Sequence, residues 1–183
     1  MIHEFYRVLN VIAIVLFCLL VSAIQSVLLK LPSLHWLELD LLLLVIVYLS
    51  LHRGFVEGVF LVCIIGRIAE VHSAAPAGII LSCYLAVFLA ILFTKEVFLV
   101  GTSFSAIILA VAGGLICKIT FLALAQRYGI LSNTWRSSLE YMFPYLISAG
   151  FFSRIIFDGL RRIDHWTKVD IDTEARELSG EEF

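Results

Sequence analysis

Charged residues and prolines are scarce in this chain, and their scarcity excludes most soluble folds. Of its 183 residues only 15% are charged and 3 are proline, whereas 61% are hydrophobic. A soluble domain of this size needs a more polar exterior than this composition can provide. The net charge of −2 also lacks the basic excess that typifies proteins that bind nucleic acid. We therefore expect no nucleic-acid partner.

Motifs for catalysis or metal binding are missing as well. The five histidines have neither HxxxH nor HExxH spacing, and no glycine-rich loop precedes a Lys-Ser or Lys-Thr pair. Ser73, Ser103 and Ser105 are not accompanied by a histidine and an orienting acid that would suggest a nucleophile triad. The sequence thus predicts a protein that is not an enzyme and has neither a cofactor nor a metal site. The four cysteines form no CxxC pair and lie in apolar runs, which favours core thiols over redox chemistry: Cys18, Cys63, Cys83 and Cys117.

What the chain does have is a succession of long apolar runs, and its mean hydropathy is +1.02. Six such segments span residues 8–29, 37–51, 55–71, 77–93, 97–124 and 139–157. Runs of roughly 17–25 apolar residues are typical of transmembrane helices. The sequence predicts an all-α membrane protein with six transmembrane helices. We expect the first run to be a retained helix, because it exceeds the roughly 7–15 apolar residues of a signal peptide.

Polar segments divide the chain and orient it. Residues 1–163 are predicted to form the six-helix transmembrane domain, and residues 164–183 a short acidic cytoplasmic tail that is disordered. A solvated end is favoured for this tail over a docking strip for a basic partner. With six spans, eight Lys and Arg residues lie on the side of both termini and three on the other: Arg7, Arg53, Lys95, Arg154, Arg161, Arg162, Lys168 and Arg176 against Lys30, Arg127 and Arg136. This bias predicts that both termini are cytoplasmic.

Small residues recur in and after the third apolar segment. Gly54, Gly58 and Gly66 are spaced by four and eight residues, which lets a neighbouring helix approach closely. Packing within the chain is favoured over packing on a partner helix, which stays open. Pro76 is expected to open the fourth helix at a position where its missing N–H costs nothing, with Gly78 in the turn.

Three charges lie within apolar segments: Arg67, Glu70 and Lys118. Insertion of such a group costs roughly 2.5–3.5 kcal/mol at the centre of a membrane helix, so each needs a partner or water. We expect Glu70 to accept from Arg67, from Lys118 or from both. The alternative is that Arg67 and Lys118 extend to the outer membrane interface.

Residues 39–96 carry a series of short motifs. In order these are Leu39-Asp40, Leu51-His52-Arg53-Gly54, Glu57-Gly58, Gly66-Arg67-Ile68-Ala69-Glu70, Ser73-Ala74-Ala75-Pro76-Ala77-Gly78, Tyr84 and Lys95-Glu96. In these motifs, and in its length and number of apolar segments, the chain resembles the MreD family of the bacterial rod-shape system. The resemblance implies a non-enzymatic scaffold or regulator in the inner membrane, in the machinery of cell elongation. The partners that it implies are the bitopic protein MreC, the actin-like MreB, and a RodA-type peptidoglycan glycosyltransferase with its transpeptidase.

A second function remains open. The MreD family is similar in fold to the substrate-binding subunits of energy-coupling-factor vitamin importers, although such likeness does not carry the function with it. An importer subunit would need an outward cavity, for which Trp36, Arg67, Glu70 and His72 are candidates. Against it, the first helix lacks a stripe of alanines for a transport partner, since Ala13 and Ala23 are too far apart.

Overall fold

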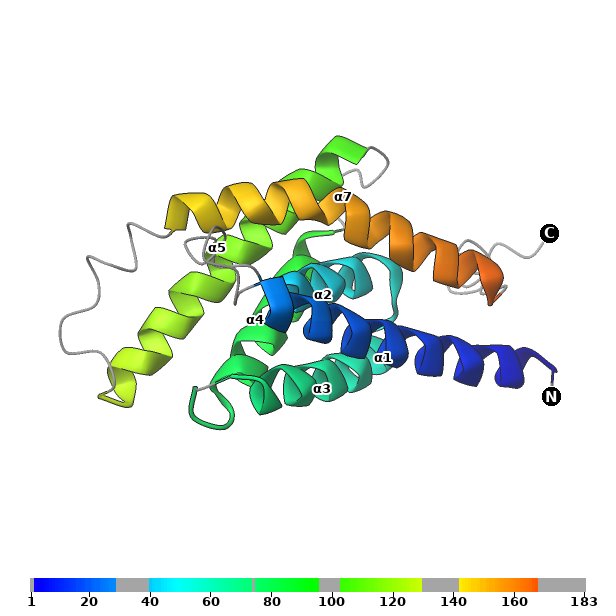
Figure 1. The fold of residues 1–183 in the computed structure, drawn as a ribbon, viewed down its shortest axis with the longest axis horizontal. Helices are drawn as coiled ribbons and strands as arrows, with labels where there is room; N and C mark the ends of the chain where they lie inside the picture. The colour runs from blue at the N-terminus through cyan, green and yellow to red at the C-terminus, as the bar shows by residue number, and fades with distance from the viewer. Residues whose placement is uncertain (1, 29–39, 74, 96–102, 130–141, 168–183) are drawn as a thin grey trace.

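The computed structural model describes residues 2–28, 40–73, 75–95, 103–129 and 142–167, and these contain six helices and no strand. The helices are α1 (Ile2–Leu28), α2 (Leu41–His52), α3 (Phe55–Val71), α4 (Ile79–Thr94), α5 (Ser103–Arg127) and α7 (Met142–Trp166). Figure 1 shows them as one bundle, with α1 and α7 reaching toward the side where both termini lie. The prediction of an all-α fold is confirmed.

Helix α2 is the centre of the bundle. Every residue from Leu41 to Ser50 is buried, as expected for a helix that is apolar on all sides. It contacts α1, α3, α4, α5 and α7. The side chain of Asp40 caps its start by accepting from Leu43 N at 3.1 Å. With 12 residues, α2 is about 18 Å long, which is well short of the roughly 30 Å hydrocarbon core of a bilayer.

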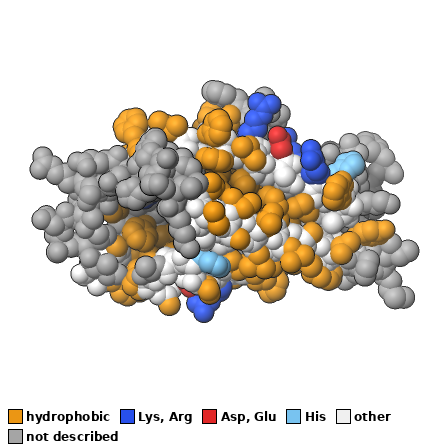
Figure 2. Space-filling view, in the orientation of Figure 1, with side chains coloured by type: hydrophobic (Ala, Val, Ile, Leu, Met, Phe, Trp, Pro, Cys, Tyr) orange, Lys and Arg blue, Asp and Glu red, His pale blue; other side chains and the backbone are white. Residues whose placement is uncertain are grey.

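The outer helices show the reverse pattern, because their exposed side chains are apolar. On α7, Phe143, Ile147, Phe151 and Ile155 repeat every four residues and are all more than half exposed. Figure 2 shows hydrophobic side chains over most of the described part of one face. By length and composition, α1 from Tyr6 to Leu28 and α5 from Ile107 to Arg127 can each cross a membrane. That all six helices do so stays a prediction.

Two expected boundaries are wrong. Helix α4 begins at Ile79, so Pro76 lies in the preceding turn and does not open the helix. The N-cap of α4 is Gly78, whose φ of 93° is a left-handed conformation that favours glycine. At the other end of the chain, α7 continues to Trp166 and buries Asp164. Asp164 therefore belongs to the bundle and not to an acidic tail; residues 168–183 lie outside the described part.

Candidate functional site

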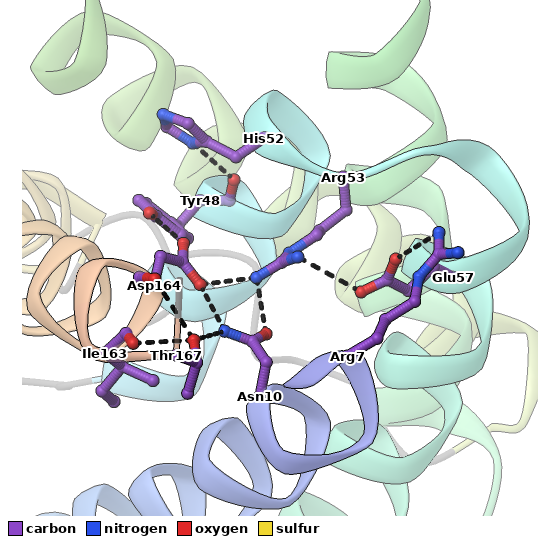
Figure 3. A network of polar contacts seen from close by, with 9 residues as sticks. All are labelled: Arg7, Asn10, Tyr48, His52, Arg53, Glu57, Ile163, Asp164 and Thr167. Carbon is purple, nitrogen blue, oxygen red and sulfur yellow. Dashed lines mark hydrogen bonds and ion pairs between the residues drawn. The ribbon is translucent and has the colours of Figure 1, made fainter. Parts of the chain in front are cut away.

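A buried ionic network joins the ends of helices at the side of the termini (Figure 3). Its centre is Arg53, which follows the last residue of α2 and is 2% exposed. Its Nη2 lies 2.5 Å from Oδ1 of Asp164, near the end of α7. The same nitrogen donates to Asn10 Oδ1 of α1 at 2.7 Å. A single guanidinium thus connects three helices that are distant in the sequence.

Asn10 completes this centre from α1. Its amide nitrogen donates to Asp164 Oδ1 at 2.9 Å and to Thr167 Oγ1 at 2.6 Å, while its oxygen accepts from Arg53. The residue is fully buried. Both ends of the amide are therefore used, as a polar group inside an apolar bundle requires.

Tyr48 supplies the second oxygen of Asp164 with a donor. The Tyr48 hydroxyl donates to Asp164 Oδ2 at 2.6 Å. Its ring is held between two others, stacked on His52 with centroids 4.2 Å apart and edge-on to Phe157 at 5.5 Å. Both carboxylate oxygens of Asp164 are thus satisfied by named side chains, which is the condition for keeping a charge buried.

Glu57 extends the network to α3 and to the surface. One of its oxygens lies 3.3 Å from Arg53 Nη1 and the other 3.3 Å from Arg7 Nη2. Arg7 is half exposed, so the described part of the network reaches the surface of the bundle. The physical effect of these contacts is to fix α1, α2, α3 and α7 relative to one another.

The three glycines that were expected to allow close helix packing differ in their surroundings. A Cβ atom at Gly58 would overlap the ring of Phe88, and one at Gly66 would lie 2.6 Å from Leu81 Cδ1 and 3.3 Å from Leu81 Cα. Phe88 and Leu81 belong to α4, so these two glycines allow α3 and α4 to pack closely within the chain. The close packing expected of Gly54 is absent, because a Cβ there would meet nothing within 4 Å.

Glu70 forms a capping site at the opposite end of α3. Its Oε2 accepts from Arg67 at 2.7 Å, which confirms the expected pair. Its Oε1 accepts from the backbone N–H of Gly78 at 2.6 Å and of Leu81 at 3.3 Å. The carboxylate therefore satisfies unpaired N–H groups at the start of α4, where the helix dipole also favours a negative charge. Lys118 is not among its partners.

Lys118 instead lines a cavity, with its Nζ 4.7 Å from the centre of the Tyr145 ring. The cavity has a volume of about 350 Å³ and includes Asp40, Tyr84 and His72 in its lining. Of the other residues expected near an outward cavity, Arg67 and Glu70 are not in its lining, and Trp36 lies outside the described residues.

Sequence reasoning missed most of the ionic network. The count of Lys and Arg places Arg53 on the side of the termini without indicating that it is buried, and the predicted domain boundary places Asp164 in a tail. The available signal was Asn10, an amide near the start of the first apolar run, since polar groups within such a run need partners. Tyr48 and Thr167 carried no comparable signal.

The described part of the chain also contains histidine, cysteine and acidic side chains, the residue types that bind metal ions. No three His, Cys, Asp or Glu side chains are grouped there so as to hold a metal ion. The four cysteines form no disulfide, and Cys83 and Cys117 share a thiol contact beside the cavity.

The chain matches no protein-family model, no curated protein and no solved structure.

Proposed function

We propose that this protein is a non-enzymatic scaffold and regulator of the bacterial cell-elongation machinery. In this role it binds an MreC-like bitopic protein and links it to peptidoglycan synthesis by a RodA-type glycosyltransferase with its transpeptidase, and to MreB. It acts by favouring one conformation of its partners through contacts, without chemistry of its own.

The observation that carries the proposal is where the motifs of residues 39–96 lie. Those between Arg53 and Gly78 provide contacts between helices of the bundle: Arg53 joins the turn after α2 to α1, α3 and α7, Gly58 and Gly66 pack against α4, and Glu70 caps the start of α4. The motifs that resemble the MreD family are thus used here to build a rigid body. A scaffold needs such rigidity, because an interface ordered in advance loses less entropy on binding.

The proposed place of the protein is the bacterial inner membrane, with six spans and both termini in the cytoplasm. Support comes from the apolar exterior of α1 and α7 and from the bias of Lys and Arg toward the side of the termini. Helices shorter than the bilayer, such as α2, are accommodated because their neighbours bury them. Reporter fusions at both ends and in the 129–142 connection test this arrangement; a C-terminus outside the cytoplasm would overturn it.

The proposed partner surface is the outward face of α3. A shallow apolar groove there is lined by Phe60, Cys63, Ile64, Arg67, Ile68 and Val71, on the helix that carries Gly58 and Gly66. A single membrane helix of an MreC-like protein fits such a surface. A photo-crosslinking residue at Phe60 is expected to capture that protein, whereas one at Phe151, equally apolar and exposed on α7, is expected to capture less.

Depletion with imaging of cell shape tests the role itself. Rods are expected to become round, and the purified protein is expected to bring an MreC-like protein with it. Normal rods with a nutrient requirement would overturn the scaffold proposal.

One observation favours a second candidate, the substrate-binding subunit of a small-molecule importer. This is the cavity of about 350 Å³ with polar side chains in its lining, which falls in the usual size range of ligand sites. A vitamin that purifies with the protein, together with a transport ATPase, would favour this candidate over the scaffold.

A further inference from the structure

The cavity lies at the opposite end of the bundle from the ionic network. The network joins Asn10, near the start of α1, to Arg53, just after the end of α2, and to Asp164, near the end of α7. The cavity is lined from the other ends of these helices, as by Ser22 of α1 and Tyr145 of α7, and from α3, α4 and α5. Side chains from all six described helices therefore converge on one space of about 350 Å³, a size that suits a single small molecule.

Asp40 brings an incompletely paired carboxylate to this space. Its Oδ1 accepts from Leu43 N at 3.1 Å and from the Tyr84 hydroxyl at 2.7 Å. Among the described residues, none donates to Oδ2. Since a carboxylate can accept several hydrogen bonds and accepts them strongly, this oxygen favours a ligand with an N–H or O–H group.

Gln25 adds donors to the same edge of the cavity. Its side-chain oxygen accepts from Leu41 N at 3.1 Å, and so the first turn of α2 holds both Gln25 and Asp40. The amide N–H groups of Gln25 have no acceptor among the described residues. Where α1 approaches the start of α2, the cavity therefore presents an amide donor together with an anionic acceptor.

These two groups restrict the chemistry of a ligand. An ammonium group donates to Asp40 but cannot accept from Gln25, and a carboxylate accepts from Gln25 but is repelled by Asp40. A planar amide or ureide has an N–H group beside a carbonyl oxygen and can pair with both residues. Such pairing leaves neither side with an unsatisfied polar group, which would be costly inside an apolar bundle.

The remaining lining suits a flat ring. Leu42, Ile80 and Phe121 contribute apolar side chains from three different helices. A heterocycle can bury its faces against such groups while the polar edge of the ring bonds to the protein. Lys118 and Tyr145 contact each other in the lining, and neither is required for the two hydrogen bonds to the ligand.

We propose that this cavity binds a small neutral heterocycle with a cyclic amide or ureide group, whose N–H donates to Asp40 and whose carbonyl oxygen accepts from Gln25. The inference rests on the cavity and goes beyond the scaffold role. It supplies a ligand class that the importer candidate leaves open, and the binding itself needs no transport partner. Loss of this binding would leave the capture of an MreC-like protein at Phe60 unchanged.

Binding measurements on the purified full chain in phosphatidylglycerol nanodiscs test the proposal, with empty nanodiscs as the blank. The probes are uracil and lumazine, a one-ring and a two-ring heterocycle that both carry N–H groups beside carbonyl oxygens. Their matched controls are 1,3-dimethyluracil and 1,3-dimethyllumazine, in which these nitrogens cannot donate. At least one probe is expected to bind about tenfold or more tightly than its own dimethyl analogue, because methylation removes a hydrogen bond to a charged acceptor.

Variants connect the binding to the two residues. Asp40→Asn keeps an acceptor for the first turn of α2 but replaces the unpaired oxygen by a donor, and is expected to weaken binding about tenfold or more. Gln25→Glu also keeps its acceptor, loses the amide donors and is expected to weaken binding by a similar factor. Gln126→Glu makes the same change at an exposed position near the end of α5 and is expected to leave binding unchanged.

The proposal is overturned if neither uracil nor lumazine binds, or if the dimethyl analogues bind as tightly as their parents. Binding of wild-type strength to a folded Asp40→Asn or a folded Gln25→Glu protein would overturn it as well. Should one of these variants fail to fold, the other variant and the comparison of each probe with its dimethyl analogue decide the question.

Discussion

Arg53 Nη2 and Asp164 Oδ1 lie 2.5 Å apart although 111 residues separate them in the sequence. Their side chains are only 1% and 5% exposed, so neither charge is stabilised by bulk water. The pair joins the turn after α2 to the end of α7, and Asn10 and Tyr48 supply the remaining hydrogen bonds. An ion pair buried this deeply is costly to form and more costly to break, because either partner left alone is an uncompensated charge.

Arg53→Ala is expected to lower the free energy of unfolding by about 3–5 kcal/mol, since it leaves Asp164 buried without its cation. Unfolding in detergent micelles, followed by circular dichroism, measures the change. Arg154→Ala on the exposed side of α7 is the control and is expected to have little effect. The double variant Arg53→Met, Asp164→Leu is expected to recover much of the lost stability, because it removes both charges. If Arg53→Ala and Arg154→Ala lowered the stability equally, Arg53 would not have the stabilising role described here.

Tyr48→Phe removes one hydroxyl from the network and keeps the ring between His52 and Phe157. The loss of a hydrogen bond to a charged acceptor is expected to cost about 1.5–3 kcal/mol, less than Arg53→Ala. Tyr128→Phe, at an exposed tyrosine, provides the matched comparison in the same unfolding assay. If both substitutions had the same small effect, Tyr48 would not stabilise Asp164.

Gly66→Ala is expected to destabilise the protein by about 1–3 kcal/mol, because the new methyl group would force Leu81 and with it the backbone of α4 away from α3. Gly54→Ala introduces the same chemical change where φ is −68° and nothing lies within 4 Å. The thermal midpoint of Gly54→Ala should therefore stay close to that of the wild type. If Gly54→Ala lowered the thermal midpoint more than Gly66→Ala does, α3 and α4 would be packed differently from the arrangement described here.

Glu70→Ala is expected to loosen the start of α4, because the N–H groups of Gly78 and Leu81 lose their acceptor. Hydrogen exchange followed by mass spectrometry should show faster exchange in residues 78–82. Arg67→Ala removes only the exposed partner of Glu70 and should change this exchange much less. Unchanged exchange in Glu70→Ala would mean that other groups cap the helix.

The helices were predictable from the sequence, because apolar runs and their breaks are local properties. All six predicted segments correspond to described helices, and the third was predicted with the bounds that the structure has. The errors arose where a distant contact decides the local structure. Helix α4 starts at Ile79 because Gly78 turns left-handed and Glu70, eight residues earlier, accepts its N–H. Helix α7 extends past residue 163 because Asp164 finds Arg53, Tyr48 and Asn10 at its end.

The sequence by itself determined an all-helical, strongly apolar chain and the pairing of Arg67 with Glu70, since these depend on composition and on spacing along one helix. Only the tertiary structure decided that Arg53 is buried and that Asp40 and Lys118 share a cavity. Charges on separate helices meet only when packing brings those helices together, and no local pattern in the sequence records which ends will meet.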